Sequence, residues 1–141
     1  MSHVTHVTCP CGAVEIALAS PPLAQFHCHC DDCRRVHGGA YVAVAAYPRD
    51  ALTVTRGATT SFALSVNRRL SCAACGTRLF AERPDVPVRG LNAYLLPPGA
   101  FTAQFHMFCD FAVAPLGADL PAYRTLPELF GGDGARADAR P

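Results

Sequence analysis

The feature that most constrains this chain is the arrangement of its 8 cysteines along 141 residues. All but Cys109 fall into short clusters at the start, in the first third and in the middle of the sequence. Thiols that lie this close together along a chain either form disulfides or converge on a metal ion. The first question is therefore which cysteines act together, and on what.

The central cluster has the spacing C-x-C-x-x-C and is followed directly by Arg34 and Arg35. Its thiols belong to Cys28, Cys30 and Cys33. Thiolates at this spacing can converge on one soft metal ion, and zinc is the usual choice for sulfur ligands. Three protein ligands leave the fourth corner of a tetrahedron open, which is typical of a catalytic zinc site.

The two outer clusters resemble each other, because each ends in a glycine that can take the backbone angles of a tight turn. They read Cys9-Pro10-Cys11-Gly12 and Cys72-Ala73-Ala74-Cys75-Gly76. Each supplies only two ligands, so pairing the two turns gives one closed four-cysteine zinc site. A redox C-x-x-C is the alternative, and it is less favoured because no βαβ pattern surrounds the second turn.

Metal is favoured over disulfides by the expected compartment. Residues 1–12 lack an apolar signal core, and no apolar run is long enough to cross a membrane. We therefore expect a cytoplasmic protein with no membrane partner, in which clustered cysteines indicate metal binding or catalysis.

Length and composition predict a single globular zinc-binding domain over residues 1–130. Half of the residues are hydrophobic and 16% are charged. Residues 131–141 lack a periodic apolar face, which predicts a flexible C-terminal tail. The formal net charge is +1 and no long basic run occurs, so nucleic acid is not expected as a partner. The sequence is silent on the oligomeric state.

Short β-branched and aromatic runs separated by glycine and proline predict an all-β fold. The expected extended segments are residues 13–18, 25–28, 41–47, 52–56, 59–66, 68–72, 79–81, 86–91 and 104–113. One short helix is expected between Asp31 or Asp32, as the N-cap, and Gly38-Gly39. It would place Cys33 in or beside the first helical turn, where amide donors favour a thiolate. A plain turn is the alternative.

Several further side chains are candidates for the central site. His27 and His29 flank the thiols and could supply a fourth ligand or point away. His37 could move protons at neutral pH, and His106 is as compatible with a structural role as with a functional one. Cys109, in a hydrophobic stretch, is expected to be a buried apolar residue.

The two arginines behind the central cluster have an electrostatic role. Three thiolates on Zn²⁺ leave a local charge of −1, which adjacent guanidinium groups stabilise. Arg34 or Arg35 could also bind a substrate carboxylate in a bidentate pair, or simply lie on a solvated helix face.

The order of these motifs resembles the glutathione-dependent formaldehyde-activating enzyme family, which is grouped with centromere protein V. The resemblance covers roughly residues 5–124 and rests on the three motifs Cys9-x-Cys11-Gly12, Cys28-His29-Cys30-x-x-Cys33-Arg34-Arg35 and Cys72-x-x-Cys75-Gly76-Thr77. It implies a β-tent fold, which is a mostly antiparallel β structure with short helical turns.

The resemblance also implies two zinc ions with different roles. By likeness, Cys9, Cys11, Cys72 and Cys75 would hold a structural zinc, and Cys28, Cys30 and Cys33 a catalytic one. The activity that it implies is the condensation of formaldehyde with glutathione to S-hydroxymethylglutathione, formally a carbon–sulfur lyase reaction in reverse.

The leading hypothesis is thus a zinc-dependent carbon–sulfur lyase that acts on a small thiol and an aldehyde. In it, His37 or a water moves the proton, and Arg34 or Arg35 binds a carboxylate of the thiol. A non-catalytic zinc module that binds a protein or small molecule is the first alternative, with the second zinc closed by His29 or Cys109. A thiol-based sensor of metal or aldehyde is the second.

Overall fold

The computed structural model describes residues 3–117 and 119–137. They form two compact units, the first built from the described parts of 1–24 and 45–101, the second from those of 25–44 and 102–141. The architecture is mostly β and largely antiparallel with one short α-helix, as the sequence predicts. The assignment of residues 1–130 to a single domain stays a prediction.

The first unit contains a three-stranded antiparallel sheet in the order β1 (Thr5–Thr8), β2 (Glu15–Leu18) and β5 (Leu52–Arg56). The turn that carries Cys9 joins β1 to β2, and β2 pairs with β5. Apolar side chains alternate along these strands and are buried on one face, as expected for a sheet with one face in a core. These are Val7, Ile16, Leu18 and Leu52.

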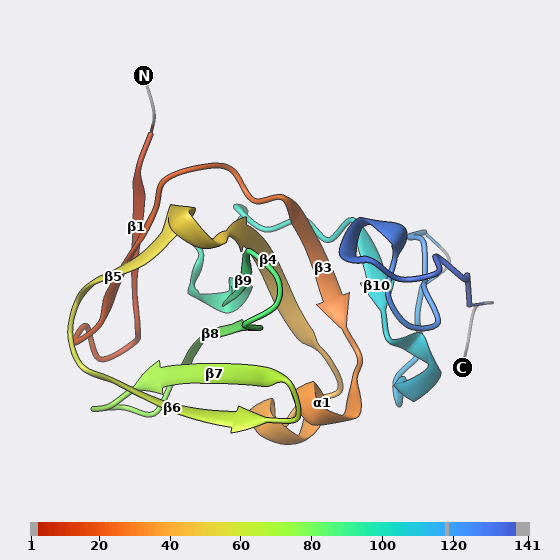
Figure 1. The fold of residues 1–141 in the computed structure, drawn as a ribbon, viewed down its shortest axis with the longest axis horizontal. Coiled ribbons are helices and arrows are strands. Elements are labelled where there is room, and N and C mark those ends of the chain that lie inside the picture. Colours follow the sequence, from red (N-terminus) through yellow and green to blue (C-terminus); the bar gives the residue numbers. More distant parts are fainter. Residues whose placement is uncertain (1–2, 118, 138–141) are drawn as a thin grey trace. The chain divides into compact units, whose positions relative to one another are not determined.

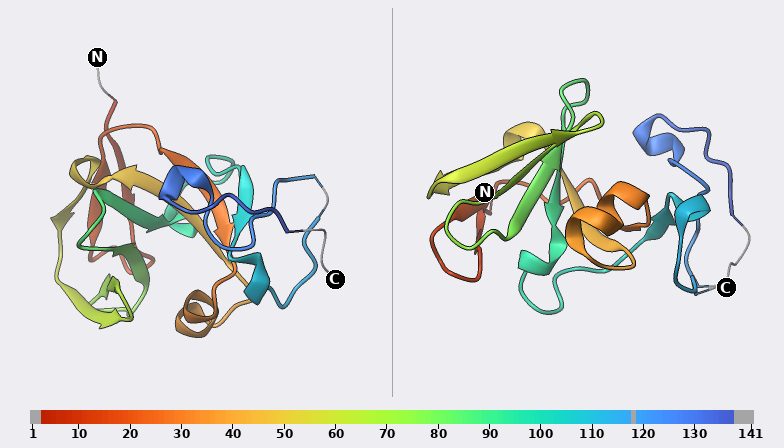
Figure 2. Two further views of the ribbon diagram at one scale, coloured as in Figure 1. Left: turned by 45° about the vertical axis from the view of Figure 1, so that its right-hand side comes forward. Right: turned by 90° about the horizontal axis from the view of Figure 1, so that it is seen from below.

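The same unit contains an antiparallel meander, shown from three directions in Figures 1 and 2. Its strands are β6 (Thr59–Leu64), β7 (Asn67–Cys72), β8 (Arg78–Glu82) and β9 (Val88–Asn92). Each is within a few residues of a predicted extended segment. Leu70 lies opposite Phe80, which lies opposite Leu91, so a row of buried apolar side chains crosses three strands.

Three further elements flank these strands in the sequence, and one of them, β4, is itself a sheet strand next to β9. The strand β4 (Val42–Pro48) leads from the second unit into the first. The 3-10 turn η1 (Arg49–Ala51) follows it and precedes β5, and η2 (Ala93–Leu95) follows β9.

The second unit is organised around the parallel pair β3 (Ala24–Cys28) and β10 (Phe105–Met107). Phe26 and Phe105 are paired across these strands with their rings stacked at 5.1 Å, and Phe130 contacts Phe26 edge-on at 5.4 Å. Such aromatic pairs stabilise a core beyond their buried area. They hold β3 in place up to the point where the central thiols begin.

The short helix α1 (Asp31–His37) follows β3 directly (Figure 1). Its N-cap is Cys30, and the Cys30 sulfur accepts a hydrogen bond from the Cys33 amide at 3.2 Å. The expectation that Asp31 or Asp32 caps the helix is therefore wrong, because both lie inside the first turn. The expected end is confirmed: Gly38 takes a left-handed conformation with φ of 74°.

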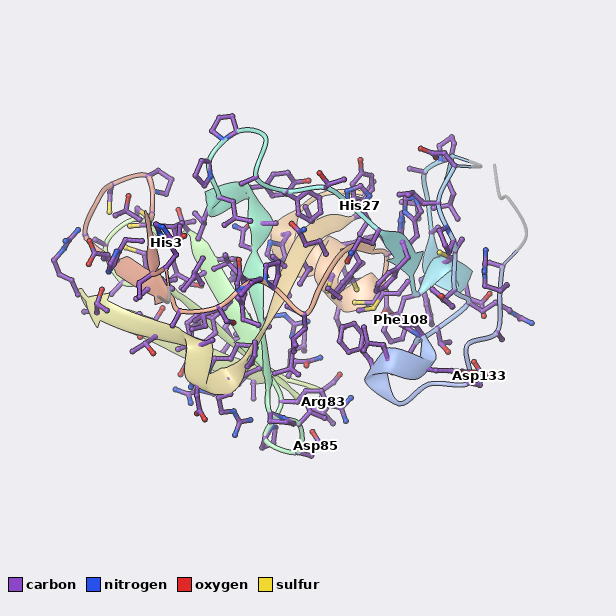
Figure 3. All side chains as sticks on the ribbon, turned by 90° about the horizontal axis from the view of Figure 1, so that it is seen from above. His3, His27, Arg83, Asp85, Phe108 and Asp133 are labelled. Carbon is purple, nitrogen blue, oxygen red and sulfur yellow. The ribbon has the colours of Figure 1, made fainter. Side chains whose placement is uncertain are left out.

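The predicted strand over residues 104–113 is also wrong in its length. Only Phe105–Met107 are extended, since Phe108 has a left-handed φ of 56° and the 3-10 turn η3 (Cys109–Phe111) follows. Phe108 is labelled at this turn in Figure 3. Cys109 is fully buried against Leu116 and Ala122, which agrees with its predicted apolar role.

The last described residues pair with an earlier part of the second unit. Beyond η4 (Glu128–Phe130), Arg136 forms an antiparallel bridge with Tyr123. The Ala137 amide donates to the Ala122 carbonyl at 2.8 Å. The tail predicted for 131–141 therefore includes a segment with backbone hydrogen bonds, and residues 138–141 lie outside the described residues.

Gly57, in the turn between β5 and β6, provides a test of this packing. Its φ is 96°, and a Cβ added there would lie 2.2 Å from the Ala13 carbonyl oxygen. Because that oxygen belongs to backbone, Gly57→Ala is expected to lower the free energy of unfolding by more than about 2 kcal/mol. Urea unfolding measures the change.

Gly99→Ala is the matched control. Gly99 has a similar φ of 84° but nothing within 4 Å of an added Cβ. The loss should be only about 1 kcal/mol, which is the cost of the left-handed conformation alone. Equal losses in the two variants would contradict the close approach at Gly57.

Candidate metal centres

The first candidate centre lies in the first unit, where the two outer cysteine turns meet. Its ligand atoms all lie within 4.8 Å of one another and belong to Cys9, Cys11, Cys72 and Cys75, here called the four-cysteine cluster. The Cys11 sulfur is 3.5 Å from that of Cys9 and 3.7 Å from that of Cys72. The partition predicted from spacing is confirmed in space.

The two turns of this cluster have the same local geometry. The amides of Gly12 and Gly76 donate to the carbonyls of Cys9 and Cys72, both at 2.9 Å, and both glycines have φ of 79°. The turns also direct amides at sulfur: the Cys75 amide lies 3.4 Å from the Cys72 sulfur. Amide donors of this kind stabilise thiolates, the form that binds metal.

Three of these thiols, those of Cys9, Cys11 and Cys75, have strongly unequal pKa values. Hydrogen bonds from the Thr77 hydroxyl and amide lower the pKa of Cys75 to about 6. The Val14 amide lowers the pKa of Cys9. The Ala13 amide acts in the same direction on Cys11, but the neighbouring Cys9 sulfur and partial desolvation outweigh it and raise the pKa of Cys11 to about 12. A divalent cation would remove this competition, because it stabilises all four thiolates together.

The second candidate centre lies in the second unit, where β3 ends and α1 begins. Cys28, Cys30 and Cys33 have their sulfurs within 4.8 Å of one another and form the three-cysteine cluster. Cys28 is buried, and the other two are partly buried. The nearby thiols of Cys30 and Cys33, together with burial, raise the pKa of Cys28 well above its usual value.

No fourth His, Cys, Asp or Glu among the residues that the structure describes joins this cluster. His29 turns away from it, since its Nε2 atom lies 3.0 Å from Nδ1 of His106 in a buried hydrogen bond. Cys109 packs elsewhere in the unit. The arrangement fits a tetrahedral metal held by three thiolates, with one position left for another ligand.

Sequence reasoning did not foresee the group of rings beside this cluster. His27 and His29 come from β3 and the residue after it, His106 comes from β10, and Tyr41 precedes β4. The Tyr41 ring lies 4.5 Å from that of His27 and 5.1 Å from that of His29, measured between centroids. The parallel register that pairs His27 with His106 brings them together, and only the fold reveals it. Figure 3 labels His27 on its strand.

Burial keeps these histidines neutral. Desolvation, assisted by the neighbouring His106, lowers the pKa of His29 to about 4. Desolvation also lowers the pKa of His27 and His106. The His29 amide donates to the Met107 carbonyl at 3.0 Å, so backbone and side chain both fix the link between Cys28 and Cys30.

The two arginines of α1 differ in their surroundings. Arg35 is exposed and lies 3.8 Å from the Asp31 carboxylate, a pair of the kind that contributes little to stability. Arg34 is half-buried, and its Nε atom is buried without a hydrogen-bond partner in the described chain. His37 lies one helical turn after Cys33 and is exposed.

Comparison with known proteins places these clusters in a family context. The model of the family described as "Glutathione-dependent formaldehyde-activating enzyme" matches residues 4–110, which contain both clusters. No helix within the described ranges is long and apolar enough to cross a membrane.

Two fungal proteins, each named "Putative glutathione-dependent formaldehyde-activating enzyme", are similar to this chain over 88 residues. The one from Penicillium rubens is 32% identical, over 60% of this chain and 46% of the relative. The one from Emericella nidulans is 31% identical, over 60% and 45%. The chain thus spans about half the length of the curated relatives that it matches.

A solved structure supports the fold. The crystal structure of a Rhodobacter sphaeroides protein aligns with a TM-score of 0.55 and 29% sequence identity, over 67% of this chain and 89% of that chain.

The buried histidine pair predicts a specific response to acid. His29 has a pKa of about 4 in the folded chain, compared with an ordinary value of 6.5. Between these pH values the unfolded chain binds a proton that the folded chain does not, so this histidine destabilises the fold as the pH falls from 6.5 to 4. His29→Gln removes that term. We expect the free energy of unfolding to fall more steeply in the wild type than in the variant.

Urea unfolding at several pH values between 7 and 4 measures the two slopes. The difference between the two proteins isolates His29, because the carboxylates and the thiols are common to both. Parallel slopes would show that His29 is not held neutral in the folded chain.

Proposed function

The chain belongs to the glutathione-dependent formaldehyde-activating enzyme family, and on that basis we propose that it is a carbon–sulfur lyase-type enzyme that joins a small thiol, such as glutathione, to an aldehyde, such as formaldehyde. The observation that carries the proposal is the three-cysteine cluster. It offers three thiolate donors, and no fourth ligand joins them among the described residues. A structural zinc site is normally closed by four protein ligands, whereas a catalytic one has an open position.

The two clusters would then have separate tasks. Cys9, Cys11, Cys72 and Cys75 would hold a structural zinc, because four thiolates complete a tetrahedron. Cys28, Cys30 and Cys33 would hold the catalytic zinc, which when bound supplies a Lewis acid that lowers the pKa of a thiol.

The reaction conserves its atoms without a redox partner. The sulfur of the thiol forms a bond to the carbonyl carbon, the C=O π bond breaks, and the thiol proton ends on the former carbonyl oxygen. The product is an S-hydroxyalkyl thioether, and the reverse reaction releases the aldehyde. We assign the proton transfer to His37, directly or through water, and its exposure one turn along α1 from Cys33 supports that role.

Arg34 is the better candidate of the two arginines for binding the substrate. It is half-buried with an unpartnered Nε, whereas Arg35 already lies beside Asp31. A guanidinium group binds a carboxylate through paired hydrogen bonds, and glutathione carries carboxylates. Because glutathione and reduced thiols are cytoplasmic, we propose the cytoplasm as the site of action.

Substitution of Cys30 tests the proposal. Serine is a good N-cap, so Cys30→Ser should keep α1 while removing a zinc ligand. We expect turnover of glutathione and formaldehyde to fall at least about 100-fold, with little change in melting temperature. Zinc per chain in anaerobically purified protein should fall from two to one.

Cys75→Ser is the comparison in the other cluster. It should also remove one zinc, but with a large loss of stability, because a structural zinc contributes directly to folding. Unchanged turnover in Cys30→Ser would overturn the proposed catalysis. Two firmly held zincs without turnover in the wild type would instead favour a non-catalytic binding module.

The arginines give an independent test of substrate recognition. Arg34→Gln should raise KM for glutathione by about 10- to 100-fold with kcat nearly unchanged, since a charged hydrogen bond contributes about 1.5–3 kcal/mol. Arg35→Gln, its neighbour on the exposed face, should change KM less than about twofold. Steady-state kinetics with formaldehyde measures both.

A thiol without carboxylates, such as 2-mercaptoethanol, is the substrate control. Its KM should be the same for the wild type and for Arg34→Gln. If Arg34→Gln weakens both thiols equally, Arg34 does not bind the carboxylate.

A further inference from the structure

Most arginines of the first unit have a clear structural partner. Arg56 pairs with Glu15 at 3.3 Å, Arg83 pairs with Asp85, and Glu82 accepts from both Arg68 and Arg89 at 3.2 and 2.7 Å. Figure 3 labels Arg83 and Asp85 together in the loop between β8 and β9. Arg49 donates to two backbone carbonyls, those of residues 83 and 86. These contacts satisfy charge or hydrogen bonding within the fold.

Arg69, in the middle of β7, differs from all of them. Its side chain is only 3% exposed. Its Nη1 atom is buried, and no described residue accepts a hydrogen bond from it. No ion pair joins Arg69 to a carboxylate within the described ranges. A buried guanidinium cannot lose its proton, so it either carries a large desolvation cost or has an anion that comes from outside the chain.

The strand register defines what surrounds Arg69 on its face of the sheet. Phe62 of β6 lies directly opposite it on one side, and Ala81 of β8 on the other. Gly90 of β9 lies opposite Ala81. Directly paired residues of an antiparallel sheet project to the same face. On the β8 side, Arg69 is therefore followed by Ala81 and Gly90, and neither has a side-chain acceptor for a hydrogen bond from the guanidinium.

A second guanidinium belongs to the same face. Arg78 of β8 lies over the Phe62 ring, with its central carbon 4.7 Å from the ring centroid. Its Nη1 donates to the Ser71 hydroxyl at 2.6 Å, and Ser71 lies two residues from Arg69 on β7. Arg78 makes no ion pair with a carboxylate in the described part of the chain.

The nearest acidic residue of these strands lies on the other face. Glu82 follows Ala81 in β8, and successive side chains of a strand point to opposite faces. Glu82 pairs there with Arg68 and Arg89. One face of the meander is thus charge-balanced, while the face with Arg69 and Arg78 carries two cations and no carboxylate of its own strands.

We propose that this face, here called the Arg69 face, binds a small oxyanion, the carboxylate of an organic acid or an inorganic phosphate. Arg69 supplies the buried charge, and Arg78 and the Ser71 hydroxyl supply further donors beside it. An organic carboxylate fits best, because Phe62 and Leu64 on the edge strand β6 are 38% and 36% exposed and offer an apolar surface to its carbon chain. All the residues named for this face belong to the first unit and none belongs to the three-cysteine cluster, so the proposal does not depend on the proposed catalysis.

Thermal unfolding in a zwitterionic buffer of low anion content tests the proposal. Glutarate, phosphate and chloride are added separately at equal ionic strength, since a ligand that binds only the folded chain raises the melting temperature. The wild type should show a saturable rise with glutarate or phosphate that exceeds the response to chloride. Glutarate alone would identify an organic acid, phosphate alone the inorganic ion, and either result supports the site.

Two variants locate the effect. Arg69→Met should abolish the saturable rise, and without added anion it should be at least as stable as the wild type, since an uncompensated buried charge has been removed. Arg68→Met is the matched control on the balanced face and should keep the response. If Arg69→Met does not fold, Arg69→Lys replaces it, with binding at least about 10-fold weaker by calorimetry because the planar fork is lost.

Three results would overturn the proposal. One is a wild type that responds equally to all three anions. Another is an undiminished response in Arg69→Met or Arg69→Lys. The third is an equal loss of response in Arg68→Met, which would show that the meander responds to charge in general.

Discussion

The fold depends on bringing thiols together that would repel one another as thiolates. In both clusters, the mutual influence of neighbouring sulfurs displaces at least one pKa far from its ordinary value: Cys11 rises to about 12, and Cys28 rises well above its usual range. Backbone amides offset part of this cost, as those of Val14 and Cys75 do in the first unit. A divalent cation can offset the rest of the repulsion between the thiolates. This accounts for the presence of seven cysteines in two tight groups within β units of modest size.

The two groups could be predicted from sequence because the three-cysteine cluster is local and the four-cysteine cluster is built from two local turns. The turns at Cys9 and Cys72 carry their own glycines, and the spacing of Cys28, Cys30 and Cys33 already limits how far their sulfurs can lie apart. The same local logic predicted the helix around Cys33 and its end at Gly38. The predicted N-cap was wrong, because aspartate is the commoner residue at that position. Here the Cys30 sulfur accepts the hydrogen bond from the Cys33 amide, and the two aspartates lie inside the first turn.

What the sequence could not predict depends on strand register. His106 meets His29 only because β10 pairs in parallel with β3, a contact across 77 residues. Arg68 and Arg69 are indistinguishable as neighbours in the sequence, yet the alternation of β7 gives one a carboxylate and leaves the other buried without one. Arg34 and Arg35 differ in the same way. Adjacent residues of a helix point in different directions, so that Arg34 is half-buried and Arg35 is exposed. Such differences in burial and pairing arise from the periodicity of a strand or helix combined with tertiary packing. They cannot be predicted from composition.

The cap of α1 couples chemistry at sulfur to the position of a charged side chain. The Cys30 sulfur shares its lone pairs between the amide of the first helical turn and whatever it ligates, and Arg34 projects from that same short helix. Oxidation or alkylation of the Cys30 sulfur would therefore remove the N-cap hydrogen bond of this seven-residue helix and change the position of the Arg34 guanidinium. If the proposed function holds, this centre handles an electrophilic aldehyde, and a covalent modification of Cys30 would remove a zinc ligand and displace the proposed substrate-binding arginine together.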